Sequence, residues 1–176
     1  MILPGNSAYL WSDDLDTGEI IAYAVTDESV GDTPILRLLV DKAAKKGHKF
    51  KKIYADGAYS TDQNWIHLTR DNDYGFITSF KVNTVPKRNG CEARGLAAEK
   101  WCNTPYHVWT LDTGCHFRWK SETVFSDFKE MFLEEIFATS ELGMIREIES
   151  TIQVFNDYKK IRAEKVQITG NGVVVA

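Results

Sequence analysis

The sequence predicts an α/β fold in which a sheet of mixed strand directions is flanked by helices. Two apolar runs, residues 8–12 and 19–26, surround a segment dense in turn-forming residues and predict a β-hairpin. A helical pattern and then an apolar strand follow the hairpin, an order that is typical of a parallel crossover. Two amphipathic helical patterns occupy the C-terminal third of the chain.

The first helix follows the hairpin. Asp32 or Thr33 can cap it, and Pro34 fits its first turn. Its apolar face consists of Ile35, Leu36, Leu38, Leu39 and Ala43. Gly47 is expected to end the helix, and residues 52–55 then predict a strand.

A second helix is predicted after position 60, because Ser60-Thr61-Asp62-Gln63 fits a capping box. Turn formers at 72–75 close this helix, and residues 76–80 predict the next strand. Residues 82–117 are predicted to form an irregular insert, since prolines and glycines interrupt every period. A short strand at residues 106–110 is compatible with that insert.

Helical spacing resumes at Arg118 and continues in two segments. The buried side of the first is expected to contain Val124, Phe125, Phe128, Met131 and Phe132. The last helix has apolar residues three and four apart, at Leu142, Ile145, Ile148, Ile152 and Phe155. Residues 167–176 lack this period and are expected to form a divergent tail.

Length and composition indicate one domain, formed by residues 1–176. The chain is 43% hydrophobic and 26% charged, which is ordinary for a soluble protein. Its net charge of −4 argues against a surface that binds nucleic acid all over, but it leaves room for a local basic patch. No apolar stretch has the length of a membrane span, and the N-terminus lacks a secretory pattern. A cytoplasmic protein without a membrane partner is therefore expected.

The three cysteines, Cys91, Cys102 and Cys115, form no CxxC pair, so reduced thiols are expected. With His107 and His116 nearby they invite a zinc site, although the spacings lack the short paired knuckles of structural zinc sites. Buried or surface thiols are the simpler interpretation.

Two acidic residues carry the strongest functional signal. Asp56 follows a predicted strand, at the end where ligands commonly bind in α/β sheets. Arg118, Glu122 and Lys129 share one helical stripe, because their spacings rotate by roughly 40° and −20°. Carboxylates on a strand end and on a helix can hold a divalent metal beside a phosphate. The simpler alternatives are a turn aspartate and a solvated, ion-paired helix face.

These residues together resemble the DDE transposases of bacterial and archaeal insertion sequences. Arg118-x3-Glu122-x6-Lys129 fits the group marked by a Tyr-x2-Arg-x3-Glu-x6-Lys signature, but Cys115 stands where the aromatic residue would fall. The segment Asp56-Gly57-Ala58-Tyr59 resembles the second aspartate of the family with its following glycine and tyrosine. The resemblance covers roughly residues 8–160, and the order of the motifs makes it specific.

The resemblance implies an RNase H-like fold and DNA strand cleavage and transfer by two-metal phosphoryl transfer. Asp56 and Glu122 are then catalytic and hold Mg²⁺ or Mn²⁺, whereas Arg118 and Lys129 contact the DNA backbone. The implied partners are transposon ends and target DNA. Family members generally act as assemblies on paired DNA ends, so a homo-oligomer is an open expectation.

The resemblance also implies a first aspartate on a central strand that precedes residue 8. We therefore expect an N-terminally truncated domain, without that strand and without the preceding DNA-binding region. Asp13, Asp14 and Asp16 are nearby acids, but they fall at the predicted hairpin turn. Two ligands in place of three would weaken metal binding, so a weakly active or inactive copy is expected.

The alternative function is a non-catalytic nucleic-acid-binding or interaction module on the same scaffold. Its candidate contacts are the basic residues of the irregular stretch, Lys81, Lys87, Arg88, Arg94 and Lys100, with Trp101 nearby. A solvated loop explains the same charges. Metal-independent binding would support the module, and metal-dependent nicking that requires Asp56 and Glu122 would support the enzyme. A chain without any function as a protein is the third interpretation.

Overall fold

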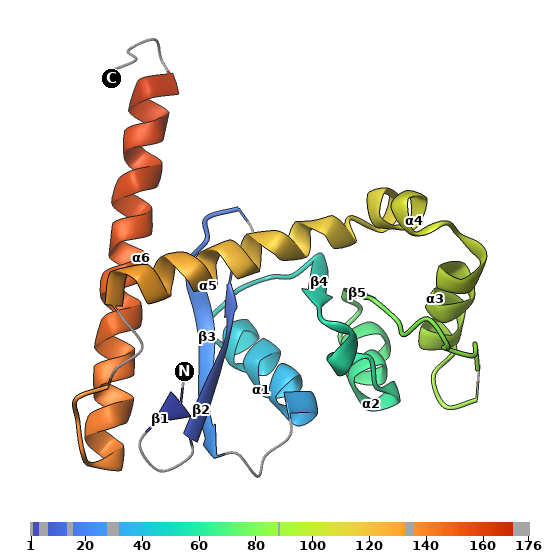
Figure 1. Cartoon of the computed structure of the whole chain (residues 1–176), viewed down its shortest axis with the longest axis horizontal. Helices are drawn as coiled ribbons and strands as arrows, with labels where there is room; N and C mark the ends of the chain where they lie inside the picture. Colours follow the sequence, from blue (N-terminus) through green and yellow to red (C-terminus); the bar gives the residue numbers. More distant parts are fainter. Residues whose placement is uncertain are drawn as a thin grey trace. The chain divides into compact units, whose positions relative to one another are not determined.

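The computed structural model describes residues 2–3, 7–13, 16–27, 32–87, 89–132 and 136–170. Its contacts divide the chain into two compact units. Unit 1 comprises Met1–Ser29 and Lys120–Ala176, and unit 2 comprises Val30–Trp119 (Figure 1). Within the described ranges, no helix is both long and apolar enough to cross a membrane.

The sheet of unit 1 is antiparallel, with the strand order β1-β2-β3. Its strands are β1 (Ile2–Leu3), β2 (Ser7–Asp13) and β3 (Ile20–Asp27), drawn in blue in Figure 1. Leu10 pairs with Ala24, and the register shifts between Ser12 and Asp13. The predicted hairpin is confirmed, and β1 adds a short third strand that was not predicted.

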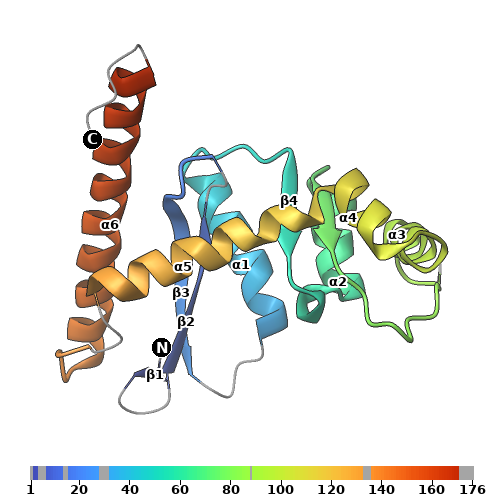
Figure 2. The ribbon, with the colours of Figure 1, turned by 45° about the horizontal axis from the view of Figure 1, so that its top comes forward.

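Two long helices complete unit 1. They are α5 (Arg118–Phe132), whose first two residues belong to unit 2, and α6 (Glu141–Gly170), one continuous helix in Figure 2. Both predicted C-terminal helices are therefore confirmed. Because α6 runs through Gly170, the predicted tail is wrong for residues 167–170, whereas residues 171–176 lie outside the described residues.

The core of unit 1 joins β3, α5 and α6. Its buried residues are Ile20, Val124, Phe128, Ile148, Ile152 and Phe155. Asn156 adds direction to this apolar packing: its Oδ1 accepts from the Ile20 N–H at 2.8 Å, and its Nδ2 donates to the Ile20 carbonyl at 2.9 Å. Lys159 donates to Asp127 of α5 at 2.6 Å. These bonds fix the register of α6, because hydrophobic packing is non-directional.

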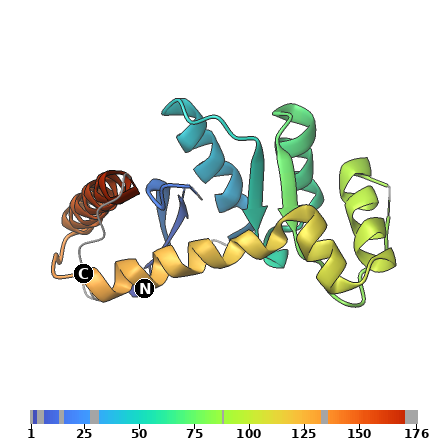
Figure 3. The same cartoon turned by 90° about the horizontal axis from the view of Figure 1, so that it is seen from above.

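Unit 2 contains a parallel pair of strands, β4 (Lys52–Ala55) and β5 (Gly75–Thr78), which appear as teal and green arrows in Figure 3. α1 (Asp32–Lys45) precedes β4. Between the strands, α2 (Asp62–Trp65) continues directly into a π-helix, Ile66–Asp71. The predicted parallel crossover is confirmed.

The N-terminal cap of α2 differs from the predicted one. Thr61, rather than Ser60, is the cap, since its Oγ1 accepts from the Asn64 N–H at 3.4 Å. The Ser60 hydroxyl accepts instead from Nε1 of Trp65 at 3.1 Å. The capping box predicted at Ser60 and Gln63 is therefore wrong, because Ser60 is used to orient a core tryptophan.

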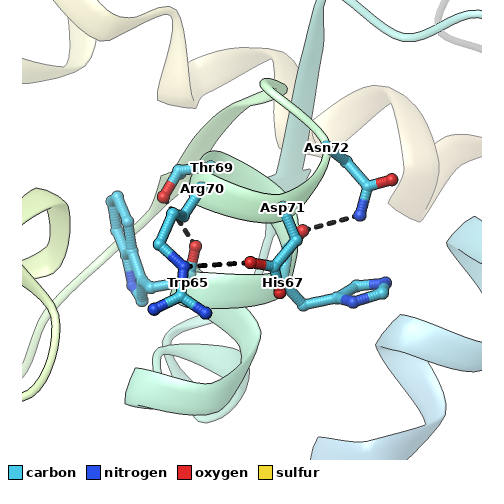
Figure 4. Close-up of polar contacts among 6 residues, drawn as sticks. All are labelled: Trp65, His67, Thr69, Arg70, Asp71 and Asn72. Carbon is cyan, nitrogen blue, oxygen red and sulfur yellow. Dashed lines mark hydrogen bonds and ion pairs between the residues drawn. The ribbon is translucent and has the colours of Figure 1, made fainter.

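Side-chain bonds accompany the change from α-helix to π-helix (Figure 4). Thr69 Oγ1 donates to the Trp65 carbonyl at 2.6 Å, and Asn72 Nδ2 donates to the His67 carbonyl at 2.7 Å. A π-helix shifts the backbone pairing by one residue, and such side-chain donors satisfy carbonyls near a helix end. Hydrophobic spacing reveals the helix, but not this change of pitch.

The segment 82–117 is largely helical, so its prediction as an irregular insert is wrong. α3 (Glu92–Asn103) and α4 (Tyr106–Thr113) occupy most of it. The strand considered at residues 106–110 lies within α4 and is wrong as well.

The ends of α4 explain the error. Residues 106–110 alternate between polar and apolar side chains, which imitates a strand. Pro105 takes the N-cap position, and Gly114 ends the helix in the left-handed region with φ of 78°. The buried residue Trp109 packs edge-on against Trp101 of α3, with 4.7 Å between the ring centroids.

The core of unit 2 surrounds Leu68, which is fully buried. Its buried neighbours are Leu36, Val40, Ala55, Trp65, Phe76, Phe80, Cys91 and Ala98. We expect Leu68→Ala to lower the free energy of unfolding by about 2–5 kcal/mol, because a cavity replaces the leucine. The matched control is Leu111→Ala, at a leucine that is 73% exposed, with an expected change below about 0.5 kcal/mol. Urea unfolding measures both, and equal effects would contradict this core.

Candidate active site

Asp56 lies immediately after β4, at the carboxyl end of the parallel sheet. It is the N-cap of the 3₁₀ helix Gly57–Tyr59, and its Oδ1 accepts from the Gly57 N–H at 2.6 Å. Its side chain is 59% exposed. The predicted strand-end position is therefore confirmed. The geometry also agrees with the simpler alternative, since this carboxylate caps a turn.

The backbone around Asp56 is held against β5. Thr78, which is buried, donates from its hydroxyl to the Asp56 carbonyl at 3.0 Å. A Cβ on Gly57 would lie 3.0 Å from the Ser79 carbonyl oxygen, so only glycine allows this approach without a shift. The sheet edge thus presents the Asp56 carboxylate from a fixed backbone.

Arg118 lies beside Asp56 within unit 2, and its Nη1 is 3.4 Å from Asp56 Oδ1. Both groups are partly exposed, so the pair contributes at most about 1 kcal/mol to stability. The interaction nevertheless brings together two of the four predicted site residues. The Gly57 N–H and Arg118 both contact Oδ1, and Oδ2 takes part in neither interaction.

Cys115 belongs to the same cluster. Burial raises the pKa of its thiol, the nearby Arg118 guanidinium lowers it, and the Asp56 carboxylate raises it. Burial also raises the pKa of Tyr54, with a further contribution from Cys115. Tyr54 meets Phe117 edge-on with 6.2 Å between the ring centroids. The region of Cys115 therefore includes two aromatic rings, although Cys115 itself replaces the aromatic residue of the signature.

Tyr54 was not among the predicted site residues. Strand alternation could have found it, because Tyr54 projects from the face of β4 opposite to Ile53 and Ala55, which contribute to the core. Gly114 is part of the same environment, since a Cβ there would lie 3.0 Å from the Tyr54 hydroxyl oxygen.

The reactivity of Cys115 should report this arrangement. Arg118→Gln is expected to raise the thiol pKa and slow alkylation, because a charge that favours the thiolate is lost. Asp56→Asn is expected to lower the pKa and speed alkylation. Iodoacetamide labelling over a pH series, in a Cys102→Ser background, measures both changes. Shifts of the same sign in the two variants would contradict the arrangement.

Glu122 and Lys129 lie on the part of α5 that belongs to unit 1. Glu122 is exposed, and the Lys129 Nζ lies 4.4 Å from the centroid of the Phe125 ring. Asp56 and Arg118 belong to unit 2, so the pairing of Asp56 with Glu122 remains a prediction.

The chemistry of the donors suits a hard cation in part. Carboxylate oxygen is the preferred ligand of Mg²⁺, and Asp56 presents such a group at an exposed sheet edge. No group of three or more histidine, cysteine or acidic residues is gathered for a metal in the part of the chain that the structure describes. This finding removes support for zinc binding by the five cysteines and histidines between positions 91 and 116.

The acids considered as substitutes for the first aspartate remain at the hairpin turn. Asp13 ends β2, Asp16 is exposed in the turn that follows, and Asp14 lies outside the described residues. Their role as metal ligands stays untested.

Comparison with known proteins identifies the class to which this fold and site belong. The family described as the Transposase DDE domain matches residues 14–147. The chain therefore belongs to the DDE transposase domain family, and the predicted family is confirmed. Searches of curated proteins and of solved structures found no match. The mixed α/β architecture, with its small parallel sheet and flanking helices, is consistent with this family.

Proposed function

We propose that the chain is a DDE transposase catalytic domain that acts in DNA strand cleavage and transfer. The observation that carries this proposal is the placement of Asp56 at the carboxyl end of β4, beside Arg118 and within the segment that matches the family. Ligands of α/β sheets bind at this edge. An RNase H-like arrangement of the complete sheet is part of the proposal.

In this proposal Asp56 and Glu122 hold divalent cations through their carboxylates. Two Mg²⁺ or Mn²⁺ ions would supply activation of a water or a 3′-hydroxyl and stabilisation of the leaving oxygen. Arg118 and Lys129 bind phosphate, the arginine as a planar fork and the lysine as a point charge. The substrates are transposon ends and target DNA, and paired ends would bring copies of the chain together.

The ion pair between Asp56 and Arg118 gives the proposal a specific consequence. A cation on Asp56 competes with the guanidinium for Oδ1, and a phosphate offers Arg118 an alternative bidentate partner. Cation and DNA should therefore each favour binding of the other at this edge. Such reciprocity is required of coupled ligands.

Nicking of supercoiled plasmid tests the proposed activity. We expect slow nicking with Mg²⁺ or Mn²⁺ and none with EDTA, because only two of the usual three carboxylates are identified. Metal-independent DNA binding without nicking, together with no measurable Mn²⁺ binding, would contradict the proposal. That outcome would favour the non-catalytic nucleic-acid-binding module, which the predicted basic residues of α3 and its preceding loop also suggest.

A further inference from the structure

A second charged feature of unit 2 lies away from Asp56. Between positions 41 and 52 the chain has six lysines and one aspartate, although its net charge is −4. We call this segment the basic turn. Its lysines are Lys42, Lys45, Lys46, Lys49, Lys51 and Lys52. All six are exposed, as is His48.

The backbone of the basic turn is well ordered. It runs from the last turn of α1 to the first residue of β4 (the loop is teal in Figure 2). Gly47 reverses the chain with φ of 93°, and the His48 N–H donates to the Ala43 carbonyl at 3.2 Å. Phe50 anchors the far side of the turn, since its ring meets that of Tyr74 edge-on at 5.4 Å. The lysines therefore project from a fixed scaffold.

Acidic groups do little to neutralise this surface. Asp41, the one acid of the segment, lies 2.8 Å from Nε2 of His67. The nearby Asp71 pairs with Arg70 at 3.0 Å. The helix dipole explains Lys42 and Lys45, because cations stabilise a helix C-terminus. It does not explain Lys49 and Lys51, which lie beyond the helix.

The basic turn and Asp56 lie at opposite ends of β4. Lys52 begins the strand and Ala55 ends it, so the four residues separate the two features by about 13 Å. One DNA duplex is wide enough to contact both ends, but each would make its own phosphate contacts. The basic turn is thus a separate binding surface.

We propose that the basic turn binds the phosphate backbone of duplex DNA independently of base sequence and of divalent metal. Lysine ammonium groups act as point charges on phosphates. The segment contains no arginine for bidentate recognition of guanine. Backbone contacts of this kind position a protein on DNA, whereas base contacts specify the sequence. This surface would hold DNA beside the catalytic edge rather than select a transposon end.

Binding of the full chain to a short duplex of mixed sequence tests this inference. Fluorescence anisotropy in EDTA, at several salt concentrations, compares the wild type with Lys45→Gln/Lys49→Gln. Each lost phosphate contact should reduce the slope of log K against log salt by about 0.9, so the double variant should lose about 1.8. The matched control is Lys81→Gln/Lys87→Gln, which removes the same charge from another exposed loop and should leave the slope unchanged.

Two outcomes would overturn the inference. One is an equal effect of both double variants, which would indicate a general charge effect. The other is unchanged DNA binding by the basic-turn variant, with or without binding to anionic lipid vesicles. The surface substitutions are expected to leave the folded state intact, as circular dichroism can verify. Repeating the measurement with Asp56→Asn separates this surface from the proposed catalysis, because binding in EDTA should survive that substitution.

Discussion

Asp56→Asn is expected to reduce metal-dependent nicking by at least about a hundredfold. Asparagine keeps the size and the turn-capping oxygen of the side chain, but it removes the negative charge that a divalent cation requires. Loss of groups that merely orient metal ligands already costs about 10–100-fold, so loss of a direct ligand should cost more. Rates of plasmid nicking with Mn²⁺, measured on equal amounts of folded protein, give the comparison.

Asp112→Asn is the control for this substitution. Asp112 is an exposed aspartate of the same unit that pairs with Lys100, so its replacement should leave nicking unchanged. If Asp56→Asn nicked DNA as fast as the wild type, Asp56 would be a turn cap only. The simpler interpretation of this residue would then be correct.

Glu122→Gln is expected to cause a loss of similar size. The substitution preserves the helix, because glutamine and glutamate have nearly equal helix propensities. A solvated glutamate on a helix face contributes only tenths of a kcal/mol, and its loss would leave nicking intact. A metal ligand cannot be replaced in this way, so the same assay distinguishes the two interpretations.

Glu130→Gln provides the matched control, since Glu130 is an exposed glutamate of the same helix. Equal nicking by the two glutamine variants would show that Glu122 has no special role. A selective loss in Glu122→Gln would support a catalytic function for the signature on α5.

Local sequence patterns predict the parts of the fold whose residues repeat regularly. The apolar face of α1 and the run that forms β4 locate the parallel crossover, and Asp56 follows from the end of that run. α4 is mispredicted because its alternating residues satisfy the strand pattern, and Pro105 and Gly114 decide for a helix. The π-helix after Trp65 depends on side-chain bonds from Thr69 and Asn72, which no periodicity reveals.

The candidate site shows the same division. Residue type and spacing single out Asp56, Arg118, Glu122 and Lys129, but they carry no information on mutual distance. The ion pair between Asp56 and Arg118 joins residues more than sixty positions apart, so it follows only from the folded chain. The basic turn escaped the sequence prediction because its lysines span a helix end, a loop and a strand start.

The central claim is that Asp56 and Glu122 together hold a divalent cation, and Mn²⁺ affinity tests it most directly. Electron paramagnetic resonance of free Mn²⁺ can give the dissociation constant of the wild type, Asp56→Asn, Glu122→Gln and the double variant. A shared site predicts that either single substitution weakens binding almost as much as the double one, because residues that act together are not additive. Wild-type affinity in either single variant would contradict the claim.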